Sequence, residues 1–129
     1  MKELYPLKGV ITTVITPFQG ENKEIDIDCL KAEIETAIQG KVAGFLVPCV
    51  ASEIPYLSFE EKLKMVKAVS EVAHGRAKVI TSINSDIPEE RIKLMKQFLD
   101  YGCDGINIAL SYTDRDTFLR DIEMIDKEK

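Results

Sequence analysis

Short apolar runs alternate with segments of helical periodicity four times along the chain, and this alternation constrains the fold more than any other feature. The runs are rich in β-branched residues and end at glycine, proline or polar residues, as strands of a buried parallel sheet do. They predict strands at residues 9–15, 44–48, 78–83 and 105–110. Alternating strands and helices with short connections form a parallel sheet with right-handed crossovers, so the sequence predicts an α/β fold, either doubly wound or a barrel.

A helix is predicted after each strand, with apolar residues three or four positions apart along it. Ser58 and Glu61 have the spacing of a capping box, and Asp86 has the position of an N-cap ahead of Pro88. The four predicted helices run from Asp26 or Asp28 to Gly40, from Ser58 to about Gly75, from Asp86 to Gly102 and from Asp116 to Asp126. Four βα units therefore fill the chain.

Length and charge limit the class of protein. A chain of 129 residues that is 45% hydrophobic fits one domain. Its 17 basic and 22 acidic residues give a net charge of -5 spread along the sequence, which disfavours a nucleic-acid partner. No apolar run approaches the roughly 18 to 20 residues of a membrane span, and residues 1–3 do not lead into a signal peptide, so we expect a cytoplasmic protein with no membrane partner.

Local motifs for cofactors and metals are absent from the sequence. Neither a glycine-rich dinucleotide fingerprint nor a P-loop follows the first predicted strand, which disfavours the nucleotide-binding members of the doubly wound fold. Cys29, Cys49 and Cys103 are far apart and lack CxxC spacing, so we predict free thiols, no disulfide framework and no metal site.

Several phrases across residues 8–112 resemble the dihydrodipicolinate synthase and N-acetylneuraminate lyase family in their order and spacing. They are Gly9-Val10-Ile11-Thr12, Thr16-Pro17-Phe18, Ile25-Asp26, the segment from Glu53 through Leu57-Ser58 to Glu60-Glu61-Lys62, and Gly102-x-Asp104-Gly105. The resemblance implies a (β/α)8 TIM barrel, of which residues 1–129 make the N-terminal half with about four βα units.

Enzymes of this family are similar to class I aldolases. In them a lysine at the end of strand six forms a Schiff base with pyruvate or another 2-oxo acid, and a tyrosine of strand five shuttles protons; no separate cofactor is needed. Both positions correspond to sequence beyond residue 129. The imine is the electron sink for the carbanion, and no carboxylate replaces it, so we predict that this segment is inactive alone.

The loop after the second strand departs from the family pattern. The family has Gly-Thr-Thr-Gly-Glu where this chain has Cys49, Val50, Ala51, Ser52 and Glu53. By resemblance these positions hold the substrate carboxylate, so Val50 and Ala51 remove both threonine hydroxyls. Ser52 offers a replacement hydroxyl from the neighbouring position, and the backbone N–H groups of the loop stay available to an anion.

Other site residues each have a structural alternative. Thr16 is a candidate for lining the substrate pocket, but threonine is also favoured in strands. Tyr112 matches the first of two family tyrosines after strand four and is a candidate catalytic residue, while Thr113 replaces the second. Glu53 is expected to brace the loop through backbone hydrogen bonds, and Cys49 is either a reactive thiol or a small buried residue.

Two functions follow from the sequence. The first is a lyase of this family that acts on a pyruvate-like 2-oxo acid when its second half is present. The second is a non-catalytic half barrel that self-associates or binds a small anion. Because a half barrel leaves two sheet edges unpaired, we expect a homo-oligomer.

Overall fold

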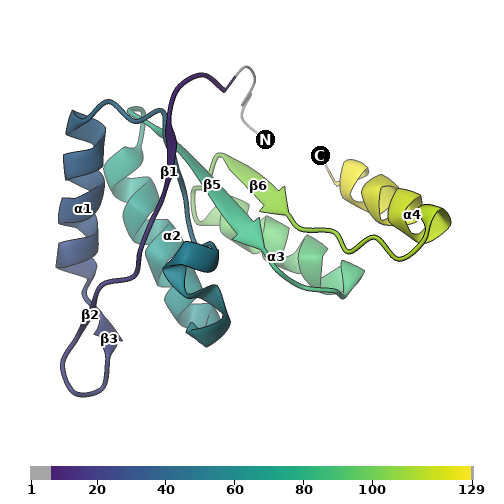
Figure 1. Cartoon of the computed structure of the whole chain (residues 1–129), viewed down its shortest axis with the longest axis horizontal. Coiled ribbons are helices and arrows are strands. Elements are labelled where there is room, and N and C mark those ends of the chain that lie inside the picture. The colour runs from purple at the N-terminus through teal and green to yellow at the C-terminus, as the bar shows by residue number, and fades with distance from the viewer. Residues whose placement is uncertain (1–6, 129) are drawn as a thin grey trace.

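The computed structural model describes residues 7–128 and contains one parallel sheet of four strands in the order β1-β4-β5-β6. The strands are β1 (Ile11–Thr13), β4 (Gly44–Leu46), β5 (Lys78–Ile83) and β6 (Gly105–Ile108). The helices are α1 (Ile27–Gln39), α2 (Phe59–Ala73), α3 (Pro88–Asp100) and α4 (Arg115–Asp126). The predicted alternation of four strands and four helices is confirmed (Figure 1).

The sheet buries one of its two faces. Burial along β5 alternates residue by residue, with Val79, Thr81 and Ile83 nearly inaccessible. On the neighbouring strand Phe45 is fully buried, and these side chains pack with Leu30 of α1 and other residues in a single core. The opposite face, which carries Leu46, Ile80 and Ser82, is only half-buried because no helix of residues 7–128 covers it. In a closed barrel this second face points inward.

Gly44 is required where β4 and β5 come closest together. A Cβ atom at this position would lie 2.7 Å from the carbonyl oxygen of Lys78 on the adjacent strand. Any side chain here would push the two strands apart, so glycine preserves the register in which Gly44 pairs with Lys78.

Several predicted boundaries are wrong in detail. The first strand covers only Ile11–Thr13, and the predicted polar turn after it contains a small antiparallel hairpin of β2 (Phe18–Gln19) and β3 (Glu24–Ile25). The strands predicted to reach residues 48 and 110 end at Leu46 and Ile108. Two 3₁₀ turns, η1 (Val50–Ser52) and η2 (Ile54–Tyr56), follow β4.

The helix caps agree with prediction in two of four cases. Asp26 caps α1, and Ser58 and Glu61 form the predicted capping box of α2. Asp86 does not cap α3; instead the Ser85 hydroxyl accepts the N–H of Ile87 at 3.2 Å and donates to Glu90 at 2.8 Å. Asp114 caps the fourth helix, which therefore begins one residue before the predicted Asp116.

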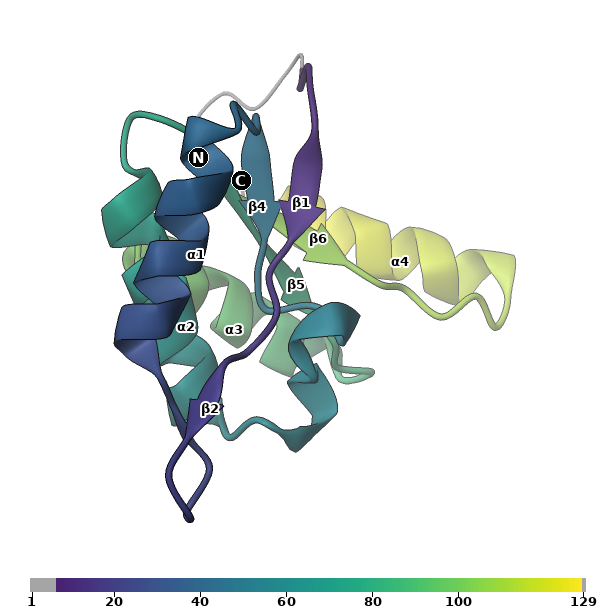
Figure 2. The ribbon, with the colours of Figure 1, turned by 60° about the vertical axis from the view of Figure 1, so that its left-hand side comes forward.

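The fourth helix lies apart from the others. In Figures 1 and 2 α4 extends away from the body formed by α1, α2 and the sheet. None of its residues is buried, and Asp121 forms an ion pair with Arg91 of α3, with 2.7 Å between the charged atoms. A second ion pair joins Glu128, just after the helix, to Lys96 of α3 at 2.6 Å. An amphipathic helix that buries no residue has an apolar face available for packing.

Candidate functional site

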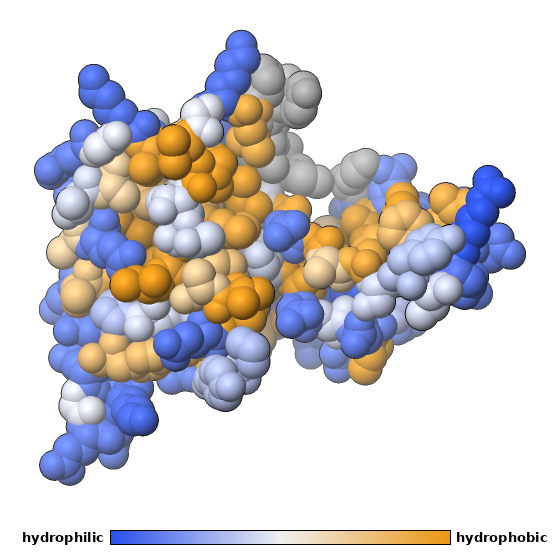
Figure 3. Space-filling view, viewed as in Figure 1, coloured by the Kyte–Doolittle hydropathy of each residue, from blue (hydrophilic) through white to orange (hydrophobic). Residues whose placement is uncertain are grey.

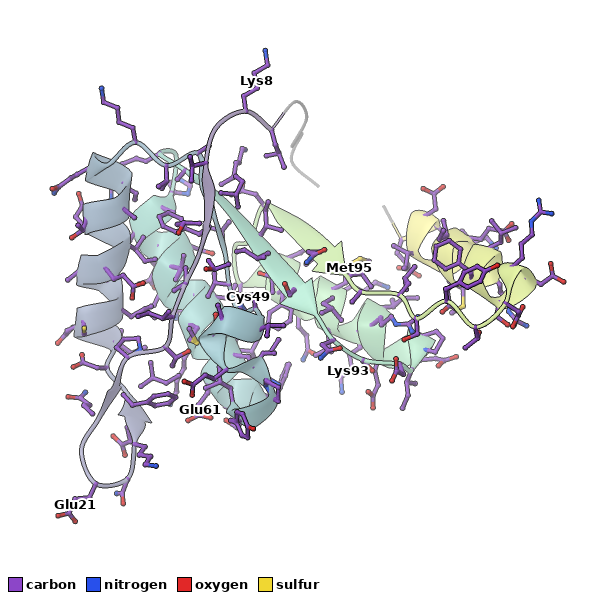
Figure 4. The ribbon with its side chains drawn as sticks, viewed as in Figure 1. Lys8, Glu21, Cys49, Glu61, Lys93 and Met95 are labelled. Carbon is purple, nitrogen blue, oxygen red and sulfur yellow. The ribbon has the colours of Figure 1, made fainter. Side chains whose placement is uncertain are left out.

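A cavity of about 560 Å³ lies at the carboxyl ends of the parallel strands. Active sites of parallel barrels are built at this end, from the ends of the strands and the loops that follow. Figure 4 labels Cys49 here, where the chain leaves β4 for η1. The lining residues are Thr13, Leu46, Cys49, Val50, Ala51, Ile54, Ser82, Ile83, Asn84, Asn107 and Ala109. A second hollow of about 440 Å³, near His74 and Lys78, lies at the opposite end, where barrels do not place their chemistry.

Val50 and Ala51 are the two predicted substrate-binding residues that the structure places in the cavity wall. The Val50 side chain is 84% exposed, which is unusual for an aliphatic residue and follows from its position at the start of a tight turn. Neither side chain has a hydrogen-bonding group. A ligand at this wall therefore meets methyl groups where a threonine pair would offer two hydroxyls.

The hydroxyl of Ser52 makes its hydrogen bonds within the protein. Its side chain is fully buried, and its Oγ donates to the carbonyl oxygen of Val14 and accepts the N–H of Cys49 at 3.1 Å. These bonds tie η1 to the strand segment that follows β1. The Ser52 hydroxyl is bonded within the loop and does not line the cavity, and its role toward a ligand stays a prediction.

Thr16 is likewise turned away from the cavity. Its hydroxyl donates to the carbonyl oxygen of Ser52 at 2.7 Å and lies 3.5 Å from the sulfur of Met65. The side chain is buried beneath the loop and does not line this cavity, and its role toward a substrate stays a prediction. The two hydroxyls of Thr16 and Ser52 together fix the shape of η1.

Tyr112 and Glu53 lie outside the cavity wall. Tyr112 is 69% exposed, and its ring meets that of Phe118 edge-on, with 5.6 Å between the ring centres. Glu53 is exposed and has a left-handed backbone with φ of 58°, and its N–H donates to Val50 while its carbonyl accepts from Tyr56. The bracing of the loop comes from this backbone, whereas the roles of the tyrosine hydroxyl and the glutamate carboxylate stay predictions.

Two polar residues of the cavity wall were missed from the sequence. Asn107 donates to the hydroxyl of Ser82 at 3.3 Å across β5 and β6, because these two residues are paired in the sheet register. Each is a polar residue inside an apolar strand, on the face that alternation directs away from the helices. These polar residues within apolar strands were the sequence signal from which the two wall positions could have been predicted.

The chemistry of the cavity wall is limited. It includes four polar side chains, Thr13, Ser82, Asn84 and Asn107, but no lysine, arginine, histidine or carboxylate. Such a wall can accept and donate hydrogen bonds, but it has neither an amine for imine formation nor a base in the neutral pH range. Within residues 7–128 no three histidine, cysteine or acidic side chains gather as a metal site.

Burial of the three cysteines bears on whether Cys49 is a reactive thiol. All three cysteines are free; Cys29 is exposed, whereas Cys49 and Cys103 are buried. Burial raises the pKa of the Cys103 thiol, so less thiolate is present at neutral pH. We expect iodoacetamide to label Cys29 first and the other two only after unfolding, as read by peptide mass spectrometry. Labelling of native Cys49 as fast as Cys29 would show a reactive thiol.

The fold and the cavity define this chain as four units of a TIM barrel, with the wall of the barrel mouth on the carboxyl ends of the strands. The model of the dihydrodipicolinate synthetase family matches residues 6–118. The chain belongs to this family, as its sequence phrases predicted. No helix in the described part of the chain is long and apolar enough to cross a membrane.

Individual relatives agree with this assignment. The chain is 36% identical over 110 residues to the 4-hydroxy-tetrahydrodipicolinate synthase of Methanocaldococcus jannaschii. This match covers 85% of the chain and 37% of that protein. The solved synthase of Methylacidiphilum fumariolicum SolV matches with a TM-score of 0.84 and 27% identity, over 94% of this chain and 41% of that one. The solved dihydrodipicolinate synthase of Aquifex aeolicus matches with a TM-score of 0.82 and 27% identity, over 94% of this chain and 42% of that one. The chain thus spans less than half the length of these relatives.

Proposed function

We propose that this chain provides the N-terminal four βα units of a lyase that forms a Schiff base with pyruvate or a related 2-oxo acid. The amine would come from a lysine in the remaining units, and residues 1–129 would be one half of the catalytic domain. The observation that supports the proposal is the position of Cys49, Val50 and Ala51, which line the cavity at the carboxyl end of the sheet. The ligand of this site would be a small 2-oxo acid. The reaction would need no separate cofactor, and the enzyme would be cytoplasmic.

Carboxylate binding in this proposal relies on the backbone of η1. The N–H groups of Cys49, Ser52 and Glu53 are bound within the loop. Those of Val50 and Ala51 are the donors that the turn retains for an anion. Hydrogen bonds to a charged group contribute more than neutral ones, so the loss of two hydroxyls weakens binding without removing every donor.

Restoring the hydroxyls tests this role. In the protein encoded by the longest reading frame that contains this sequence, Val50→Thr with Ala51→Thr is expected to tighten pyruvate binding at least about 10-fold, since each hydroxyl contributes on the order of 1 kcal/mol or more. Isothermal titration measures the change. The matched control is Val10→Thr, an exposed valine outside the cavity wall. Equal affinity in the double variant, the control and the unaltered protein would contradict pyruvate binding at this wall.

The alternative function is a half-barrel module without catalysis, and the open sheet favours it. Within residues 7–128 β1 pairs only with β4, and β6 pairs only with β5. Unpaired edges of a parallel sheet are sites of association. This second function requires a homo-oligomer.

A further inference from the structure

Two polar side chains interrupt the face of the sheet that points into the barrel. On β5 this face carries Ile80 and then Ser82, and Asn107 of β6 is paired with Ser82 in the sheet register. The side-chain amide of Asn107 donates to the Ser82 hydroxyl at 3.3 Å. Interior positions of barrels of this type are filled mostly by branched apolar residues. An amide and a hydroxyl at such positions cost free energy unless their polar atoms are hydrogen-bonded, so this pair calls for a further polar partner.

The hydrogen bond between the two side chains decides which group that partner offers. Because Asn107 donates to the serine oxygen, the Ser82 hydroxyl proton and the Asn107 amide oxygen are left for a partner, and no other residue of the described part of the chain bonds them. A ligand hydroxyl satisfies both atoms, since it accepts the serine proton and donates its own proton to the amide oxygen. A carbonyl oxygen only accepts and would leave the amide oxygen without a donor.

The pair lies beside the loop that lines the same cavity. The backbone N–H of Ser82 donates at 3.3 Å to the carbonyl oxygen of Pro48, the residue before Cys49. Ser82, Asn107 and Val50 all line the cavity, and Figure 3 shows apolar side chains gathered over the part of the molecule that carries β1 and η1. The wall therefore has an apolar part at η1 and an uncharged polar part on β5 and β6. The polar part is suited to a neutral group of the ligand and not to a second ionic group.

We propose that Ser82 and Asn107 are specificity-determining residues that bind a hydroxyl group of the 2-oxo acid, so that a hydroxylated 2-oxo acid is preferred to pyruvate. The inference rests on the proposed lyase function and names the substrate class of that site. Because the pair adjoins the loop proposed to hold the carboxylate, the hydroxyl lies within a few bonds of that carboxylate. Hydroxypyruvate is the smallest acid with this arrangement and differs from pyruvate by one oxygen atom. A site built to bind a substrate hydroxyl discriminates against the analogue that lacks it, because its polar groups then lose their partner.

Isothermal titration of the protein from the longest reading frame that contains this sequence tests the proposal, with hydroxypyruvate and pyruvate as the two ligands. Hydroxypyruvate is expected to bind at least about 10-fold more tightly. Asn107→Leu and Ser82→Ala should each remove most of this preference by weakening hydroxypyruvate binding, while pyruvate binding changes little. Asn22→Leu is the matched control, because Asn22 is exposed in the turn between β2 and β3 and lies outside the cavity wall. Circular dichroism confirms that each variant is folded.

The comparison between variants decides the outcome, because the two acids also differ in the reactivity of their carbonyl groups. A preference that survives both substitutions, or no preference in the unaltered protein, would overturn the role of the pair. An equal loss of affinity for both acids in the variants would show a structural role and overturn it as well. In each of these cases a pyruvate adduct trapped by borohydride would leave the proposed lyase function standing. If neither acid binds and neither is trapped, the lyase function fails and this inference fails with it.

Discussion

Replacing Asp121 by alanine is expected to release α4 from the rest of the molecule. Arg91 is only 4% exposed, and its guanidinium contacts Asp121 at 2.7 Å and the carbonyl of Ser85 at 2.6 Å. Removing the carboxylate leaves a buried charge without its partner, which typically costs about 3 to 5 kcal/mol. Hydrogen exchange of the α4 amides should therefore accelerate about 100-fold or more, at fixed protein concentration.

Two further variants make this prediction specific. Glu35→Ala removes the partner of Arg76, an ion pair of the same 2.7 Å length whose side chains are more than 40% exposed. Solvent screens such pairs, so this variant should change stability much less than Asp121→Ala does. Arg91→Leu with Asp121→Leu removes both charges and should restore much of the α4 protection. If Asp121→Ala and Glu35→Ala both change the hydrogen exchange of the α4 amides only slightly, the burial of Arg91 does not strengthen its contribution to the docking of α4.

Replacing Ser52 by alanine is expected to have the second largest effect. The buried hydroxyl satisfies the carbonyl of Val14 and the N–H of Cys49, and both groups lose their partner in the variant. An unsatisfied buried group costs about 1 to 3 kcal/mol. Urea unfolding at fixed protein concentration should show a lower midpoint with an unchanged slope.

Ser82→Ala is the matched control for this variant. Ser82 is half-buried, and its hydroxyl accepts one hydrogen bond from the exposed Asn107, so water can replace the lost group. We expect a change within about 0.5 kcal/mol. Equal unfolding midpoints for the two alanine variants would mean that Ser52 does not anchor η1 to the segment after β1.

The sequence predicted those parts of the fold that repeat a pattern. Residues 78–83 alternate between the two faces of a strand, and β5 occupies these six residues. The β2–β3 hairpin was missed because strands of two residues are too short to show periodicity. Asp86 was predicted as a capping residue, but Ile87 is the N-cap of α3 and makes no side-chain cap hydrogen bond; Glu90 instead reaches back to the hydroxyl of Ser85.

The sequence indicated where the loop of the candidate site lies but not the directions in which its side chains point. Matching phrases placed residues 49–53 at the end of a strand, and Val50 and Ala51 do line the cavity. The directions of the Ser52 and Thr16 hydroxyls depend on which buried carbonyl groups lie nearby, namely those of Val14 and Ser52. Such contacts join segments that are distant in sequence, and no local pattern encodes them.

We propose that this chain contributes the substrate-facing loop of an imine-forming lyase and that the Schiff-base lysine lies outside residues 1–129. Borohydride trapping with pyruvate, read by intact mass, distinguishes two samples: the 129-residue chain and the protein from the longest reading frame that contains it. Lactate, which has no carbonyl to condense with an amine, is the control. We expect a pyruvate adduct on the longer protein alone; a specific adduct on the short chain, or none on either protein, would show that the proposal is wrong.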